Sequence, residues 1–129
     1  MGPSVLVRQY AAAWSKTTRR DILSALENCW TSSSTYTDPI TDTTAGPEGL
    51  ASAILQFHDR FLGGTLAPAS ALDVHHCFGR FSWRLTTPSP TEVNGVVYGE
   101  ETEGFDFVEF SPDGKKILKV VGFFGPLAM

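Results

Sequence analysis

The spacing of hydrophobic residues changes partway along this 129-residue chain, and that change constrains the fold more than any single motif does. Up to about residue 64, apolar residues recur every three to four positions, which is typical of amphipathic helices. From about residue 70 they alternate with polar residues, which is typical of strands with one buried face. Because helical and strand patterns do not alternate, the sequence predicts an α+β fold with an antiparallel sheet.

Three helices are predicted in the first half of the chain. The first covers about residues 4–14, and the second begins near Thr18, where Thr-Arg-Arg-Asp fits a capping box. The third begins at Pro47, a residue suited to a first helical turn, and ends at Gly63-Gly64. The polar segment between the second and third helices is predicted to hold one short strand, over 34–37, and then a loop.

A first hairpin is predicted from residues 70–77 and 80–86. Pairing Cys77 with Arg80 gathers apolar side chains on one face of the hairpin and sets Asp73 opposite Arg84 on the other. The face predicted to be apolar carries Leu72, Val74, His76, Phe81, Trp83 and Leu85.

A second hairpin is predicted from residues 96–110 and 115–124, joined by Pro112-Asp113-Gly114. This register pairs Asp106 with Val120 and leaves both faces of the hairpin largely apolar. One face should cover the core, and a second copy of the chain is the simplest cover for the other. The face expected to form this homodimer interface carries Phe105, Phe107, Val121 and Phe123.

Composition narrows the classes of function. Hydrophobic residues make up 42% of the chain and charged residues 19%, so we expect residues 1–129 to form a single globular domain. The net charge of −4 argues against nucleic acid or an anionic membrane as the main partner, since both attract basic surfaces. No signal peptide or membrane segment is recognised, and Cys29 and Cys77 lack metal-ligand spacing. A cytoplasmic protein with free thiols is expected.

Asp106 is the most informative single residue for function. The predicted pairing places its carboxyl group among apolar side chains, where burial disfavours the charged form and raises the pKa. A carboxyl group kept neutral in this way can donate a hydrogen bond to a developing oxyanion or supply a proton. The alternatives are a slipped register that exposes Asp106, or a carboxyl group satisfied by a backbone amide.

Asp38, Tyr10 and His76 each have a structural and a functional interpretation. Asp38 precedes Pro39, and such a pair is most often part of a turn, although a carboxylate at a cavity could act as a base. Tyr10 lies on the apolar face of the first predicted helix, either as a core residue or as a donor to a substrate oxygen. His76 shares its predicted face with Trp83, where a lone histidine is more often a satisfied core residue than a catalyst.

Several short motifs occur in an order that resembles a known family. They are Tyr10, Tyr36-Thr37-Asp38-Pro39, Gly49-Leu50, Asp73-Val74-His75-His76, Phe81-Ser82-Trp83, Gly104-Phe105-Asp106-Phe107 and the segment from Val120 to Gly125. From about Val5 to Gly125, the chain is similar to the SnoaL-like, ketosteroid-isomerase-like branch of the nuclear transport factor 2-like (NTF2-like) superfamily. The resemblance implies three N-terminal helices packed on a strongly curved antiparallel sheet, with a cone-shaped pocket between them.

The resemblance also implies site residues. Ketosteroid isomerases of this family use an Asp base, a Tyr and a protonated Asp, whose counterparts here are Asp38, Tyr10 and Asp106. It implies no cofactor and no metal. Limonene-type epoxide hydrolases carry an Arg two residues before their sheet Asp, and Gly104 stands there in this chain. The substrate-binding wall is expected to comprise Trp14, Phe57, Phe61, His76, Trp83 and Phe124.

The favoured hypothesis is therefore an enzyme that catalyses cofactor-free proton transfer next to a carbonyl, of the isomerase or cyclase type. The alternative is a non-catalytic binding module for a hydrophobic small molecule, which the same aromatic wall would serve. A protein-interaction module would need a further exposed docking surface, and the sequence indicates none beyond the expected dimer face.

Overall fold

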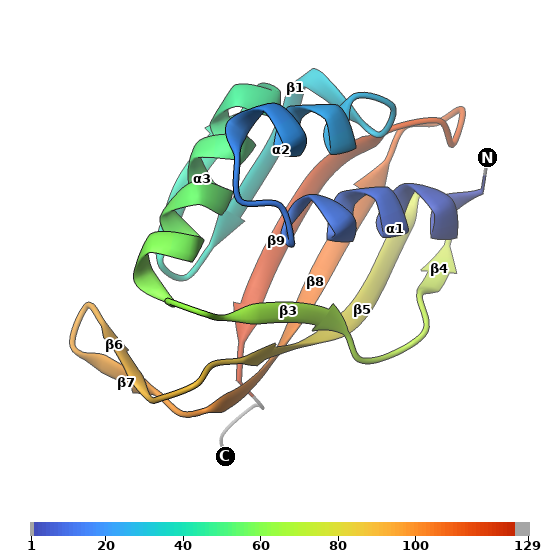
Figure 1. Ribbon diagram of the computed structural model, residues 1–129. Coiled ribbons are helices and arrows are strands. Elements are labelled where there is room, and N and C mark those ends of the chain that lie inside the picture. The colour runs from blue at the N-terminus through green and yellow to red at the C-terminus, as the bar shows by residue number, and fades with distance from the viewer. Residues whose placement is uncertain (1, 126–129) are drawn as a thin grey trace.

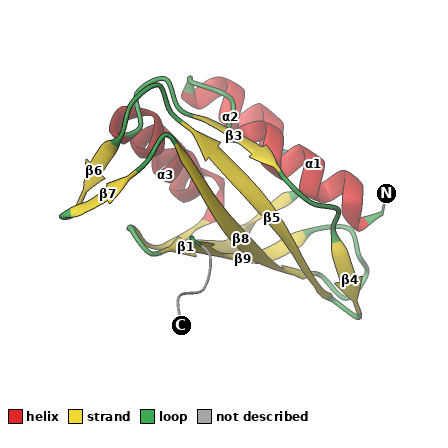
Figure 2. Cartoon of the chain, turned by 90° about the horizontal axis from the view of Figure 1, so that it is seen from below, coloured by secondary structure: helices red, strands yellow, loops and turns green. Residues whose placement is uncertain are grey.

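The computed structural model describes residues 2–125 (Figure 1). In chain order, its elements are α1 (Pro3–Ala13), α2 (Arg19–Leu26), β1 (Trp30–Asp38), β2 (Thr41–Ala45), α3 (Gly46–Arg60), β3 (Thr65–Pro68), β4 (Asp73–His75), β5 (Phe78–Thr86), β6 (Thr91–Val93), β7 (Val96–Tyr98), β8 (Glu101–Phe110) and β9 (Ile117–Phe124). The three helices lie over one face of a strongly curved sheet, and the β6–β7 hairpin projects from one end (Figures 1 and 2). The α+β class and the curved sheet predicted from the sequence are confirmed.

The sheet is mixed, which corrects the prediction of a purely antiparallel one. Its strands follow the order β2-β1-β9-β8-β5-β3, and β4 pairs with the other end of β5. β1 and β9 run parallel, whereas the remaining pairs are antiparallel. Parallel neighbours need a long connection, and here most of the chain lies between them. The helices are also not all N-terminal to the sheet, because α3 follows β1 and β2.

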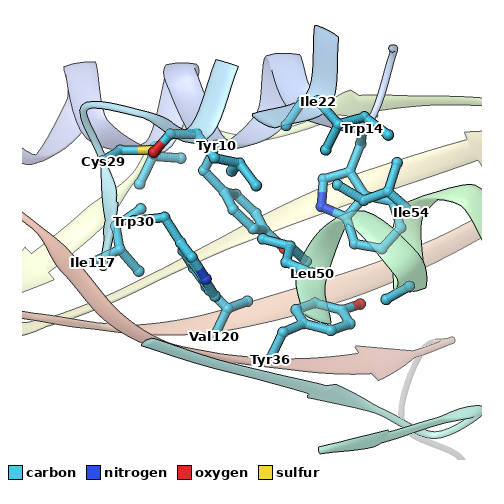
Figure 3. Packing of buried hydrophobic residues seen from close by; sticks show 14 of the residues in the cluster. Tyr10, Trp14, Ile22, Cys29, Trp30, Tyr36, Leu50, Ile54, Ile117 and Val120 are labelled. Atoms are coloured by element: carbon cyan, nitrogen blue, oxygen red, sulfur yellow. The ribbon is translucent and has the colours of Figure 1, made fainter. Parts of the chain in front are cut away.

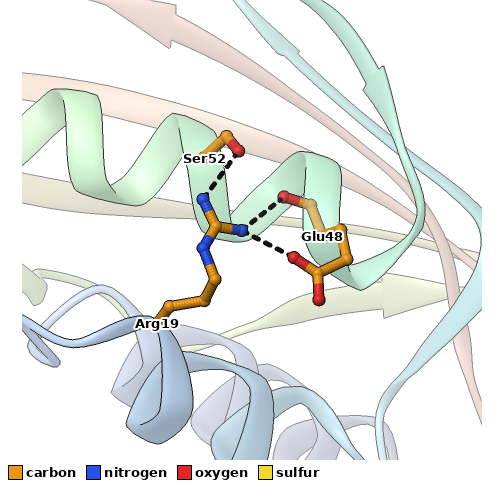
Figure 4. A network of polar contacts seen from close by, with 3 residues as sticks. All are labelled: Arg19, Glu48 and Ser52. Atoms are coloured by element: carbon orange, nitrogen blue, oxygen red, sulfur yellow. Dashed lines mark hydrogen bonds and ion pairs between the residues drawn. The ribbon is translucent and has the colours of Figure 1, made fainter.

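Local signals explain where the helices begin. The Thr18 side chain accepts a hydrogen bond from the Asp21 backbone amide at 3.2 Å, which is the N-cap bond of the predicted capping box. Arg19 then ties α2 to α3: it reaches the Glu48 carboxylate at 2.6 Å and the Ser52 hydroxyl at 3.1 Å (Figure 4). Because these side chains are substantially exposed, the pair contributes at most about 1 kcal/mol to stability.

The core fills the space between the helices and the concave face of the sheet. Ile22, Leu50 and Ile54 are fully buried, and Tyr10 stacks on Trp30 with ring centroids 5.8 Å apart (Figure 3). Each such side chain removed from water stabilises the fold by about 1.5–3 kcal/mol. This packing holds α1 and α3 over the sheet. Within residues 2–125, no helix is both long and apolar enough to cross a bilayer.

The register predicted for the first hairpin is wrong. Asp73 pairs with Arg80 and His75 with Phe78, so the turn falls at His76-Cys77. The cause is competition for β5: β3 occupies the positions beside Trp83 and the residues after it, leaving only the first residues of β5 for β4. The structure also adds three features that the prediction lacked, namely strand β2, strand β3 and the β6–β7 hairpin.

The second hairpin is offset by two residues from its predicted register. Asp106 pairs with Gly122 rather than Val120, and a bulge lies between Glu109 and Phe110. Because side chains alternate with a period of two, an offset of two leaves every residue of β8 on its predicted face. Asp106 is therefore buried, while the outer face exposes Phe105 (45%), Phe107 (36%) and Phe123 (55%).

Candidate functional site

A mainly apolar cavity lies between α1, α3 and the concave face of the sheet. Its volume is about 70 Å³. The predicted site residues found in its lining are Tyr10, Trp14, Asp38, Phe57, Phe61, Trp83, Asp106 and Phe124. The structure thus brings together eight side chains that come from two helices and four strands or strand ends. A concave, mainly apolar wall with a few convergent polar groups is the usual form of a small-molecule site.

Asp106 is the buried acid of this cavity. It is 6% exposed, and its Oδ1 accepts a hydrogen bond from the Trp83 indole nitrogen at 3.0 Å. Burial raises the pKa of Asp106 from 3.8 to about 7, and the charge of Asp38 adds to this effect. Hydrogen bonds from Trp83 and Tyr10 oppose it. Asp106 is therefore poised between its neutral and charged forms near neutral pH.

Gly104 makes the Trp83–Asp106 contact possible. Trp83 pairs with Gly104 across β5 and β8, and its indole ring lies directly over the glycine. A Cβ atom added at Gly104 would lie 2.0 Å from the ring, a distance no real structure tolerates. The absence of a side chain at 104 thus lets the indole lie along β8 and reach the carboxyl group two residues on.

Replacing Gly104 by alanine should raise the pKa of Asp106. The added methyl group displaces the indole, and the hydrogen bond that favours the charged carboxylate weakens. We expect the ionisation constant of Asp106 to fall about tenfold. Overpacking should also lower the free energy of unfolding by about 1–3 kcal/mol. Carbon-13 NMR titration of the Asp106 carboxyl group measures the first effect.

The matched control is the same substitution in a Trp83→Ala background. There the indole is gone, so Gly104→Ala should leave the pKa of Asp106 unchanged. An equal change of pKa in both backgrounds would show that Gly104 acts by some route other than the indole.

Asp38 is held in a fixed orientation at the end of β1. Its Oδ2 accepts a hydrogen bond from the Tyr36 hydroxyl at 2.5 Å, and its Oδ1 accepts one from the Ile40 backbone amide at 2.9 Å. The second contact is the turn geometry expected of an Asp-Pro pair, and Asp38 also lines the cavity. The structural and functional interpretations of this residue are therefore compatible.

Gly122 separates the two acids. A Cβ atom there would lie 3.2 Å from the Asp38 Cβ, 3.3 Å from the Asp106 Oδ1 and 3.5 Å from the Tyr36 hydroxyl. Acidic side chains from β1 and β8 thus flank a residue that has no side chain of its own. Any larger residue at 122 would occupy the space between them.

Tyr10 and Tyr36 complete the polar part of the site. Desolvation raises the pKa of both phenols well above the usual value of 10, and the neighbouring acids strengthen this effect. Both hydroxyl groups therefore stay protonated and can donate hydrogen bonds. Tyr36 was not among the predicted site residues, although it is two positions before Asp38 and strand residues two apart share a face.

His76 does not lie at the cavity, which corrects its predicted place in the wall. It is exposed in the turn between β4 and β5, with a left-handed backbone angle φ of 54°. Its Nδ1 lies 3.1 Å from that of His75. The displacement follows from the hairpin register, which takes residue 76 off the sheet altogether.

Two polar lining residues on α3, Gln56 and Arg60, were not predicted. Both lie near the end of α3, and the Arg60 guanidinium donates a hydrogen bond to the Ile40 carbonyl at 3.1 Å. Polar residues on a helix are usually solvated, so periodicity gives no signal that these two border a cavity.

No protein-family profile and no curated protein matches the sequence. Solved structures do match. A SnoaL-like family protein from Agrobacterium tumefaciens, described as a candidate isomerase, is 29% identical with a TM-score of 0.76, over 95% of this chain and 96% of that one. A hypothetical protein with a ketosteroid-isomerase-like fold from Catenulispora acidiphila, in complex with trimethylamine, is 12% identical with a TM-score of 0.70, over 97% of this chain and 88% of that one. A candidate SnoaL-like polyketide cyclase from Shewanella denitrificans is 11% identical with a TM-score of 0.64, over 95% and 89%.

Proposed function

Since the chain has the SnoaL-like, ketosteroid-isomerase-like fold of the NTF2-like superfamily, we propose that it is an enzyme that moves a proton next to a carbonyl group. The observation that supports this most strongly is that Asp38 and Asp106 flank Gly122 and both line the same mainly apolar cavity. Two acids in unlike surroundings can divide the roles of base and acid between them. The reaction would need no cofactor.

The proposed first step removes a proton from the carbon beside the carbonyl. The Asp38 carboxylate takes this proton, and the electron pair of the C–H bond moves into an enolate whose charge lies on the carbonyl oxygen. Tyr36 and the Ile40 amide hold the Asp38 carboxyl group, so little motion is needed to align it.

The proposed role of Asp106 and Tyr10 is to stabilise the enolate oxygen. Protonated Asp106 donates a hydrogen bond to it, and the buried Tyr10 phenol donates a second. In an isomerase, Asp38 then returns the proton to a different carbon of the enolate. In a cyclase, the enolate carbon instead attacks a second carbonyl of the same molecule, and the new alkoxide takes up the proton that Asp38 removed in the first step, which regenerates the Asp38 carboxylate.

Deuterium exchange tests this proposal without knowledge of the natural substrate. Flat ketones, β,γ-unsaturated ketones and aromatic polyketide-like diketones are incubated with the protein in D₂O, and loss of the α-proton signal is followed by NMR. Enzyme-dependent exchange is expected for at least one compound that binds. Compounds that bind in the cavity but never exchange would contradict the proposal and support the binding-module alternative.

A homodimer through the outer face of the sheet is proposed as the assembly. The exposed aromatic residues Phe105, Phe107 and Phe123 lie together on β8 and β9, with Val121 among them. An apolar patch of this kind is usually covered by another molecule, and a two-fold copy presents the same surface in return.

Phe123→Lys should convert the dimer into a monomer, because it places a charge in an apolar interface. Sedimentation velocity would show a shift from about 28 kDa to the 14.0 kDa of the single chain. Leu62→Lys is the matched control, since Leu62 is an apolar residue exposed away from this face, and it should leave the mass unchanged. A monomeric wild type would contradict the assembly.

A further inference from the structure

A polar groove adjoins the apolar cavity. Its lining combines the β1–β2 turn, one side of α3 and Asn94 from the turn between β6 and β7, and it measures about 500 Å³. The residues that border both the cavity and the groove are Asp38, Ile40, Thr41, Ala53, Gln56 and Arg60. The two spaces therefore share a boundary, and a molecule longer than the cavity would extend into the groove.

Arg60 stands at this boundary without an ion-pair partner among the described residues. It donates one hydrogen bond, to the Ile40 carbonyl at 3.1 Å, which leaves other guanidinium N–H groups free. Within residues 2–125 it forms no ion pair, whereas Arg19, Arg80 and Arg84 each pair with an acid. Arg60 lies in the last turn of α3, where the helix dipole favours a cation. This interaction with the dipole does not occupy the remaining N–H donors of the guanidinium group.

The acids of the groove are placed differently. Both Asp38 oxygens already accept hydrogen bonds within the protein. Asp42 lines the groove but not the cavity, whereas Arg60 borders both spaces. The guanidinium fork fits a carboxylate with two parallel hydrogen bonds.

We propose that the substrate has two parts: a flat apolar body bearing the carbonyl, held in the cavity, and a tail ending in a carboxylate, held by Arg60 in the groove. This inference rests on the proposed function and adds a substrate class to it. Arg60 would then set specificity and orient the body toward Asp38 and Asp106, without itself touching the reacting atoms.

Binding of naphthol probes tests this inference without turnover. The probes are 2-naphthol and 6-substituted 2-naphthols whose tails of one to three methylene groups end in a carboxylate, a primary amide or an amine. Fluorescence titration at pH 6 and low salt gives each dissociation constant. The best carboxylate should bind about tenfold more tightly than its amide, as charge-assisted hydrogen bonds to arginine predict.

Three variants separate Arg60 from general charge effects. Arg60→Gln should abolish the preference for carboxylate over amide. Arg20→Gln makes the same change of net charge on α2, away from both spaces, and should keep the preference. Asp42→Asn should increase the preference two- to threefold, roughly, because it removes an opposing charge.

The outcomes also separate this inference from the proposed function. Equal binding of carboxylate and amide, or tighter binding of the amine, would overturn the inference and leave proton transfer in place. A preference that survives Arg60→Gln would overturn it as well. If none of the naphthols binds, both the carboxylate tail and the flat apolar body of the proposed substrate are contradicted. The deuterium-exchange experiment would then test the proposed proton transfer independently.

Discussion

Asp38→Asn should abolish proton transfer while leaving ligand binding nearly intact. Asparagine has the shape of aspartate and can still accept the hydrogen bond from the Ile40 amide, but it cannot take a proton from carbon. Loss of a positioned general base typically lowers the rate by about 10²–10⁴-fold. The rate of α-proton exchange measures this loss, and the dissociation constant for 2-naphthol measures binding, which should change by less than about threefold.

Asp59→Asn serves as the matched control. Asp59 is exposed on α3 and lines neither the cavity nor the groove, so the same chemical change there should leave the exchange rate as in the wild type. Equal exchange rates in Asp38→Asn and the wild type would remove Asp38 from the mechanism. If Asp38→Asn loses both ligand binding and proton exchange, Asp38 maintains the shape of the cavity and is not identified as the base.

The predictions from sequence succeeded where periodicity alone decides the outcome. The face of Asp106 was predicted correctly although its partner was not, because a register error of two residues preserves the face. Leu50, Ile54 and Phe57 follow one helical stripe, and all three are buried. The pairing of β4 failed because its true register depends on β3, a strand of four residues with no alternating signal that an isolated hairpin argument can detect.

The site shows the same division between local and distant effects. Asp38 and Tyr36 are neighbours in sequence, so their hydrogen bond follows from the geometry of one strand. The contact between Trp83 and Asp106 joins two strands and depends on a glycine opposite the indole. Nothing in the local sequence around Gly104 indicates that contact. Arg60 borders the cavity only because the β1–β2 turn comes under the end of α3, which is a property of the whole fold.

Asp106→Asn should make the protein more stable at high pH and less active. Folding raises the pKa of Asp106 from 3.8 to about 7. Well below pH 4 the acid is protonated in both the folded and the unfolded chain. Ionisation of Asp106 then takes nothing from the free energy of unfolding of the wild type. Between about pH 4 and pH 7 only the unfolded chain ionises, and the free energy of unfolding falls as the pH rises. A pKa difference of about 3 corresponds to about 4 kcal/mol.

Asparagine carries no charge at any of these pH values, so the free energy of unfolding of the variant does not fall in this way as the pH rises. Its free energy of unfolding relative to the wild type should therefore increase by up to about 4 kcal/mol between pH 4 and pH 8, as measured by urea denaturation. In α-proton exchange, the wild-type rate should fall as the pH passes about 7, because the neutral donor ionises. The variant should exchange about 10²-fold more slowly and lack this limb of the pH profile. A stability difference that is constant from pH 4 to pH 8 would show that Asp106 titrates as an ordinary exposed acid, and the neutral donor would then be lost from the proposed mechanism.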